Sequence, residues 1–334
     1  MKHLKAVLFL TALLVAGLFA FRTYNARQFH LEQDTRFLMD TYVTIYAVGP
    51  AADTKPAIRK AFDRMQAVDE KFNIHNPESP LYAFNEAGTP ITDPEILSVT
   101  RLALSVSRET EGAFDITISP LVDLWGFYGD DPAVPDDVAI DAALERVGYE
   151  DLELTDGALR KRRPDVQIDL GGIAKGFVIG AAAETLKENG APSALIDAGG
   201  DVYAMGTKGQ TPWKVGIRNP RGDEILGYVE VTDLAVMGSG DYERYFMHDG
   251  RRYHHILDPQ TGYPSEGTIA VNLFAADPLT ADVWCTAVFV LGPEKGLEMV
   301  EKKAGMEAIV VADTGEKRLS SGLKRLLKDL PETE

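Results

Sequence analysis

Hydrophobic and polar residues follow patterns that predict a mixture of strands and helices. Residues 37–48 (FLMDTYVTIYAV) are rich in β-branched and aromatic side chains, which predicts one β-strand. Residues 55–72 carry apolar side chains at helical spacing, and residues 95–109 predict a second helix. Hairpins and helices are mixed without a repeating strand–helix–strand unit, so the pattern predicts an α+β fold.

The second half of the chain is richer in glycine, and its elements are shorter. A loop is expected at 171–176 and a hairpin turn at 199–201, while an earlier turn is expected at 85–88. The remaining predicted elements are strands at 166–170, 194–197, 213–218, 227–231 and 234–237 and helices at 177–189 and 279–291.

The N-terminus has the layout of an export signal. Residues 6–21 form a continuous apolar run of sixteen residues behind Lys2 and Lys5. The small-residue pattern of a cleavage site is poor, which favours an uncleaved membrane anchor over a cleaved signal. The positive flank places the body outside the cytoplasm. We therefore predict an anchor or signal segment at 1–30, a single domain at 31–334, and a location at the periplasmic face of a bacterial inner membrane, or in the periplasm after cleavage.

Charge and cysteine content narrow the possible partners. The formal net charge is −17, and the first 30 residues contribute four basic residues and no acid, which leaves −21 for the rest. So acidic a body repels nucleic acid and anionic lipid surfaces. An anionic substrate must therefore be bound by a local positive group, such as a metal ion, a lysine or a helix N-terminus. Cys285 is the only cysteine, which excludes an internal disulfide and a cysteine-based zinc site.

The strongest indication of chemistry lies between residues 254 and 286. Asp282 and Thr286 are four residues apart in a predicted helix, so their side chains lie on one face. A carboxylate and a hydroxyl are hard oxygen ligands of the kind that Mg2+ prefers, and Mg2+ often bridges to phosphates. His254 and His255 precede a D-P-x-T-G turn and supply a group that can carry a proton. The pattern predicts chemistry on a phosphate. The alternative is local pairing of Asp282 and a bond from Thr286 to its own helix.

A second segment fits the same chemistry. Residues 168–176 (IDLGGIAKG) join a predicted strand to a helix through glycines and place Lys175 at the helix start. Backbone N–H groups at a helix N-terminus, with a lysine nearby, form a cradle for phosphate. Tight packing of strand against helix is the alternative interpretation. Neither an H-E-x-x-H nor a G-x-S-x-G pattern occurs, which argues against zinc and against an α/β-hydrolase nucleophile.

Taken together, eight segments resemble the motifs of the ApbE family, the FAD:protein FMN transferases, in the same order. They span nearly everything after residue 35. The segments are M-x-T at 39–41, SPLYAFN at 79–85, GAFDITISPLVDLWGF at 112–127, IDLGGIAKG at 168–176, the G-G-D turn at 199–201, SGDYER at 239–244, HHILDPQTGYP at 254–264 and the D-x-x-x-T pair at 282–286.

The resemblance implies a tunnelling-fold-like α+β core and an enzyme that uses Mg2+ to move the FMN portion of FAD to a Thr hydroxyl of an acceptor protein, with release of AMP. It implies Mg2+ ligands at Asp282, Thr286 and the backbone carbonyl of Ala174, and a catalytic histidine at His255. The acceptor hydroxyl needs a base, for which His255 and Asp258 are both candidates. The residues in motifs that line the FAD site are Met39, Asn85, Asp169, Lys175, Asp201 and Asp241.

The implied acceptors are membrane or exported flavoprotein subunits of electron-transport complexes. Two other functions remain open: a pyrophosphatase that cuts FAD to FMN and AMP, and a periplasmic FAD-binding protein without turnover. The chain also departs from the family pattern. It has no lipid-attachment cysteine, so anchoring depends on residues 6–21, and Met237 and Gly238 stand where a small residue usually precedes the S-G pair.

Overall fold

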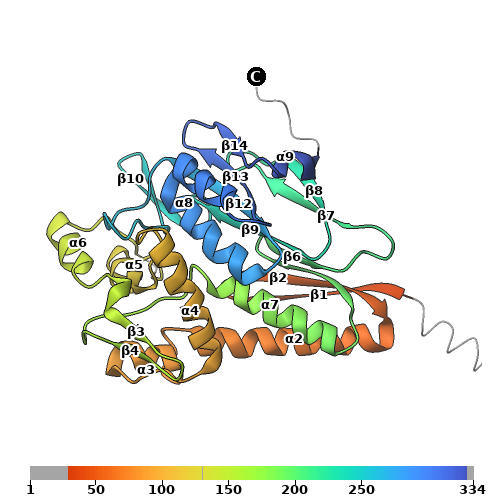
Figure 1. Ribbon diagram of the computed structural model, residues 1–334, viewed down its shortest axis with the longest axis horizontal. Coiled ribbons are helices and arrows are strands. Elements are labelled where there is room, and N and C mark those ends of the chain that lie inside the picture. Colours follow the sequence, from red (N-terminus) through yellow and green to blue (C-terminus); the bar gives the residue numbers. More distant parts are fainter. Residues whose placement is uncertain (1–28, 130, 329–334) are drawn as a thin grey trace, which may run out of the picture.

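The computed structural model describes residues 29–129 and 131–328, and its centre is one antiparallel sheet (Figure 1). Every neighbouring pair of strands in this sheet runs antiparallel. In spatial order the eight strands are β1 (Phe29–Leu38), β2 (Thr41–Pro50), β5 (Ser193–Ala198), β6 (Asp201–Met205), β9 (Leu234–Gly240), β12 (Thr268–Ala275), β13 (Glu307–Ala312) and β14 (Lys317–Leu319).

Helices cover one face of the sheet, and a smaller sheet covers part of the other. The long helices α2 (Ala51–Phe72), α7 (Ala174–Glu188) and α8 (Pro278–Glu301) lie side by side across the first face (Figure 1). On the opposite face, β7 (Trp213–Arg218) and β8 (Ile225–Val231) pack with the short strand β15 (Leu327–Lys328). Each face of the sheet therefore has its own hydrophobic core.

Shorter elements complete the described chain. The helices are α3 (Pro80–Ala87), α4 (Pro94–Glu109), α5 (Ser119–Trp125), α6 (Asp137–Leu144) and α9 (Leu323–Leu326), with 3-10 turns η1 (Ile116–Ile118) and η2 (Tyr149–Asp151). The hairpins are β3 (Leu152–Leu154) with β4 (Leu159–Lys161) and β10 (Tyr245–His248) with β11 (Arg251–His254). The mixture of antiparallel sheets and helices confirms the predicted α+β class.

The prediction of a single strand at 37–48 is wrong, because these residues form the facing ends of two strands joined by a hairpin turn. β1 and β2 meet at a two-residue turn, Met39 and Asp40, whose φ angles are 52° and 57°. Such turns usually contain Gly or Asn, and their absence here hid the turn from a reading of the sequence. The turn at 199–201 is a hairpin as predicted. Gly199 has a φ of 67°, and a Cβ there would lie 2.3 Å from the Thr41 hydroxyl.

Two further predictions need correction near the site. Residues 166–170 form no strand, because the Asn85 side chain takes the place of a neighbouring strand and exchanges two 2.8 Å hydrogen bonds with the backbone of Ile168. Asn85 itself lies in the last turn of α3 rather than in a free turn. Helix α7 begins at Ala174, three residues before the predicted start, so Lys175 lies in its first turn.

The predicted N-terminal anchor, apart from its last two residues, lies outside the described residues. Among those that are described, no helix is both long enough and apolar enough to cross a bilayer.

Candidate active site

The largest concentration of predicted site residues surrounds a cavity of about 840 Å3. The cavity lies between the tip of the β1–β2 hairpin, the first turn of α7, the middle of α8, the end of β9 and the loop after β11. Its volume is in the upper part of the range usual for ligand sites. Seven predicted residues line it: Met39, Asp169, Ala174, Lys175, His255, Asp282 and Thr286.

Gly176 allows helices α7 and α8 to meet closely at the floor of this cavity. A Cβ at that position would lie 2.4 Å from the Pro278 carbonyl oxygen and 2.7 Å from the Asp282 Cβ. The close approach lets the Gly176 N–H donate to Asp282 Oδ2 at 2.7 Å. The glycine therefore fixes the position of the Asp282 carboxylate relative to the N-terminus of α7.

Lys175 faces two buried carboxylates. Its ammonium group forms an ion pair with Asp201, and Asp201 also accepts the Gly238 N–H at 2.7 Å. Burial disfavours the ammonium form, but the charges of Asp201 and Asp282 outweigh burial and raise the pKa of Lys175. Lys175 thus remains a cation in the cavity wall, inside a protein whose net charge is strongly negative.

The oxygen atoms around Asp282 fit a hard divalent cation. Asp282 is 5% exposed, and burial, followed by the charge of Asp201, raises its pKa, while Lys175 acts in the opposite direction. Thr286 lies one turn further along α8, and its hydroxyl donates to the Gly172 carbonyl at 3.2 Å. A buried carboxylate beside a hydroxyl and backbone carbonyls is a donor set that a cation would stabilise in its ionised form.

No cluster of three or more His, Cys, Asp or Glu side chains suited to a metal occurs within 29–129 and 131–328. A cation at Asp282 would therefore have one carboxylate, the Thr286 hydroxyl and carbonyls such as that of Ala174, with its other positions left for water and phosphate oxygens. Mg2+ is usually held with few protein carboxylates and several waters.

His255 is held as a neutral imidazole at the cavity wall. Its Nδ1 lies 3.1 Å from the Arg244 carbonyl oxygen, and its backbone N–H donates to the same oxygen at 3.0 Å. Because a carbonyl only accepts, Nδ1 carries the proton and Nε2 keeps a free lone pair. Burial, then the charges of Arg244 and His254, lowers the pKa of His255 to about 3. At neutral pH His255 is therefore uncharged, and its Nε2 can accept a hydrogen bond from a hydroxyl.

Asp169 belongs to a polar wall on another side of the cavity. Its Oδ1 accepts the Gly171 N–H at 2.7 Å, and its Oδ2 accepts the Tyr128 hydroxyl. The Tyr128 ring meets His75 edge to face at a centroid distance of 5.2 Å, and both residues line the cavity. The sequence does not single out Tyr128, His75 or Arg244 as site residues, although Arg244 is the last residue of the SGDYER segment.

Four predicted residues lie outside the cavity lining. The Asn85 side chain forms hydrogen bonds with the backbone of Ile168. Asp201 is linked to the cavity through its ion pair with Lys175. Asp241 is held by Arg221 at 2.6 and 2.8 Å and by Arg252 at 3.0 Å. Asp258 organises the turn that follows β11, where its Oδ1 accepts the Gln260 N–H at 2.9 Å. The structure brings His255, and not Asp258, to the cavity wall.

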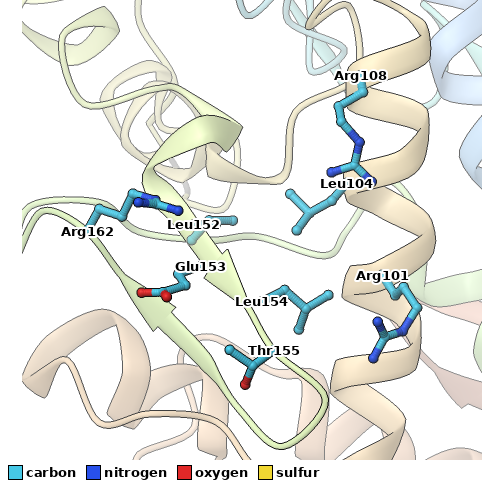
Figure 2. Close-up of a pocket in the computed structure, with 8 residues that line it drawn as sticks. All are labelled: Arg101, Leu104, Arg108, Leu152, Glu153, Leu154, Thr155 and Arg162. Atoms are coloured by element: carbon cyan, nitrogen blue, oxygen red, sulfur yellow. The ribbon is translucent and has the colours of Figure 1, made fainter.

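A second, smaller cavity of about 420 Å3 contains none of the predicted residues (Figure 2). It lies between α4 and the β3–β4 hairpin. Figure 2 shows Arg101 and Arg108 extending from α4 and Arg162 on the opposite side, with three leucine side chains between them.

Comparisons with known proteins show the family to which the chain belongs. The family model for the ApbE family matches residues 39–310. The FAD:protein FMN transferase of Treponema pallidum (strain Nichols) is 33% identical over 303 residues, which cover 84% of this chain and 84% of the relative. The solved structure of the ApbE protein from Thermotoga maritima has a TM-score of 0.85 at 32% identity, covering 90% of this chain and all of that one. The flavin transferase ApbE from Vibrio cholerae has a TM-score of 0.80 at 29% identity and covers 89% of this chain and 100% of its own. This chain belongs to the ApbE family.

Proposed function

We propose that this protein transfers the FMN portion of FAD to a threonine hydroxyl of an acceptor protein and releases AMP. The observation that carries the proposal is the convergence of Lys175, His255, Asp282 and Thr286 on one cavity of about 840 Å3. Relatives that match most of the chain are named FAD:protein FMN transferases, which supports flavin transfer to protein as the activity.

Residues at the start of α7 would hold the pyrophosphate of FAD. The Ala174 and Gly176 N–H groups already donate to Leu170 and Asp282, so the first turn of α7 offers an anion the positive end of the helix dipole and the charge of Lys175. These local groups overcome the general repulsion of an anion by a chain with a formal charge of −17. Asp169 and Tyr128 on the far wall offer polar contacts to the remainder of the ligand.

Asp282, Thr286 and the Ala174 carbonyl are the residues that would hold Mg2+. A bound Mg2+ would neutralise charge on the pyrophosphate and stabilise AMP as the leaving group. The role of this chain is to fix the carboxylate through Gly176 and to keep Lys175 charged beside it.

His255 would accept the proton of the attacking hydroxyl. The threonine oxygen forms a bond to the phosphorus of the FMN half, and the bond between that phosphorus and the bridging oxygen breaks. The electron pair leaves with AMP, and the threonine proton goes to Nε2 of His255. A neutral imidazole whose other nitrogen donates to a backbone carbonyl is oriented for this step.

The acceptors that fit this proposal are flavoprotein subunits of membrane electron-transport complexes, and the protein would act at the periplasmic face of the membrane. Support for the location comes from the apolar run 6–21 behind Lys2 and Lys5. Protease treatment of intact spheroplasts tests it, because the body of a periplasmic protein is cleaved and that of a cytoplasmic protein is protected.

The test of the activity is to mix protein, FAD, Mg2+ and a candidate acceptor domain that contains a threonine. Intact acceptor mass and AMP release are measured together. We expect a mass gain of one FMN residue for each AMP, lost with a chelator and in Asp282→Ala. AMP and free FMN without labelling of any acceptor would instead indicate a pyrophosphatase. FAD that binds and stays intact would indicate a flavin carrier.

A further inference from the structure

The tip of the β1–β2 hairpin carries two exposed aromatic side chains. Phe37 and Tyr42 are cross-strand neighbours, 63% and 71% exposed, with ring centroids 5.5 Å apart in an edge-to-face arrangement. Side chains alternate along a strand, so they point away from the face on which the adjacent Val43 is fully buried against the helices. Aromatic residues are enriched in protein interfaces, where they supply a large share of the binding energy.

The same tip forms one edge of the active-site opening. Phe37, Met39, Asp40 and Thr41 all line the cavity, whereas Tyr42 lies just outside the lining. Met39 and Asp40 adopt left-handed backbone conformations, which side chains other than glycine take at a cost and which tend to occur at functional sites. Asp40 also pairs with Arg244 of the opposite wall at 3.4 Å. The aromatic pair therefore lies beside the cavity lining.

We infer that Phe37 and Tyr42 form the docking surface for the polypeptide acceptor, next to its reacting threonine. This inference rests on the proposed function, because flavin transfer requires a large co-substrate to place one hydroxyl inside the cavity while the rest of the acceptor stays outside. The aromatic pair lies where that outer part first meets the enzyme. It would bind an apolar side chain near the acceptor threonine.

The chain's own N-terminal segment joins the hairpin at the other end. Phe29 pairs with Pro50, nine residues before the tip, which is about 30 Å along an extended strand. The acceptor is thus the occupant that the position of the pair favours, because the tip adjoins the cavity in which the transfer would take place.

The test compares Tyr42→Thr with Tyr42→Phe in the full-length protein. Threonine keeps a β-branched strand residue and removes the ring, whereas phenylalanine keeps the ring. We expect Tyr42→Thr to raise KM for the acceptor domain about tenfold or more, the effect of removing an aromatic residue at an interface hot spot. The Kd for FAD should not change, because Tyr42 does not line the cavity. Tyr42→Phe should restore most of the loss. Ile225→Thr, a 55% exposed strand residue outside the cavity lining, is the matched control and should behave as the parent protein.

Three results would overturn the inference. An unchanged acceptor KM in Tyr42→Thr, with normal transfer, removes the docking role and leaves the proposed function intact. A change in sedimentation from dimer to monomer without a change in KM assigns the surface to a second copy of this chain. A parent protein that cleaves FAD but labels no acceptor overturns the proposed function, and the docking surface with it.

Discussion

Gly176 provides the sharpest test of how the two central helices build the site. In Gly176→Ala the new methyl group would lie 2.4 Å from the Pro278 carbonyl oxygen and 2.8 Å from the Leu279 Cα, and both are backbone atoms that cannot rotate away. Ordinary contact begins near 3.4 Å, so α7 and α8 must separate by about 1 Å. Overpacking of this kind costs about 1–3 kcal/mol, and the better helix propensity of alanine offsets up to about 1 kcal/mol.

The expected net loss is about 1–2 kcal/mol, which for a chain of this length corresponds to a fall of about 2–3 °C in Tm by thermal unfolding. The same separation breaks the 2.7 Å bond from Gly176 to Asp282, and a displacement of about 1 Å in a reacting group can lower kcat about 100-fold.

Gly180→Ala is the matched control. It lies one turn further along α7, and its Cβ would meet only the Pro278 Cγ at 3.3 Å, so kcat should stay close to the parent value and Tm should be unchanged or slightly higher. Parent-like stability and activity in Gly176→Ala would refute the argument that close helix packing positions Asp282.

Three further predictions concern the polar groups of the cavity. Tyr128→Phe removes the donor to Asp169 and should lower the free energy of unfolding in urea by about 1–3 kcal/mol; no change would mean that water replaces the hydroxyl. His255→Ala should lower kcat about 100- to 10,000-fold while the affinity for FAD is kept. Because the pKa of His255 is lowered to about 3, the pH–rate profile of the parent protein should show no change near pH 6.5, about the ordinary pKa of histidine. The pKa of Asp282 is raised in the folded, metal-free protein, which therefore keeps a proton there at a pH at which the unfolded chain has released it. Protonation of Asp282 thus stabilises the fold at low pH, and this stabilisation is lost as the pH rises through the folded pKa. Mg2+ should therefore raise Tm more at about pH 8 than at about pH 5, and Asp282→Asn should abolish the difference.

Local patterns determined how well the fold could be predicted. Strand β7 was predicted with the observed bounds, because its residues alternate strictly between buried and exposed. The β1–β2 turn is not apparent from the sequence, because it contains no glycine and Met39 is an unusual residue at a left-handed position, although Asp40 is a common one. Residues 166–170 have the apolar pattern of a strand, while the hydrogen-bond partner of the Ile168 backbone is a side chain 83 positions away.

The same distinction between local and distant contacts applies to the site. Asp282 and Thr286 share one helix, so their spacing alone predicted that they act together. The contacts from Gly176 to Asp282 and from Tyr128 to Asp169 join residues 106 and 41 positions apart, and no periodicity in one sequence encodes them. The resemblance to the family motifs predicted that segments far apart in the sequence share one site. It did not predict that Asp258 and Asp241 lie outside the cavity lining.

The central claim is that one cavity holds both the divalent cation and the pyrophosphate of FAD. Crystals grown with FAD and Mn2+ in place of Mg2+ test it most directly, because Mn2+ gives an anomalous signal. We expect the anomalous peak within bonding distance of Asp282 and Thr286, with the pyrophosphate against Lys175 and the start of α7. An anomalous peak elsewhere, or FAD bound in the arginine-lined cavity between α4 and β3, would contradict the account.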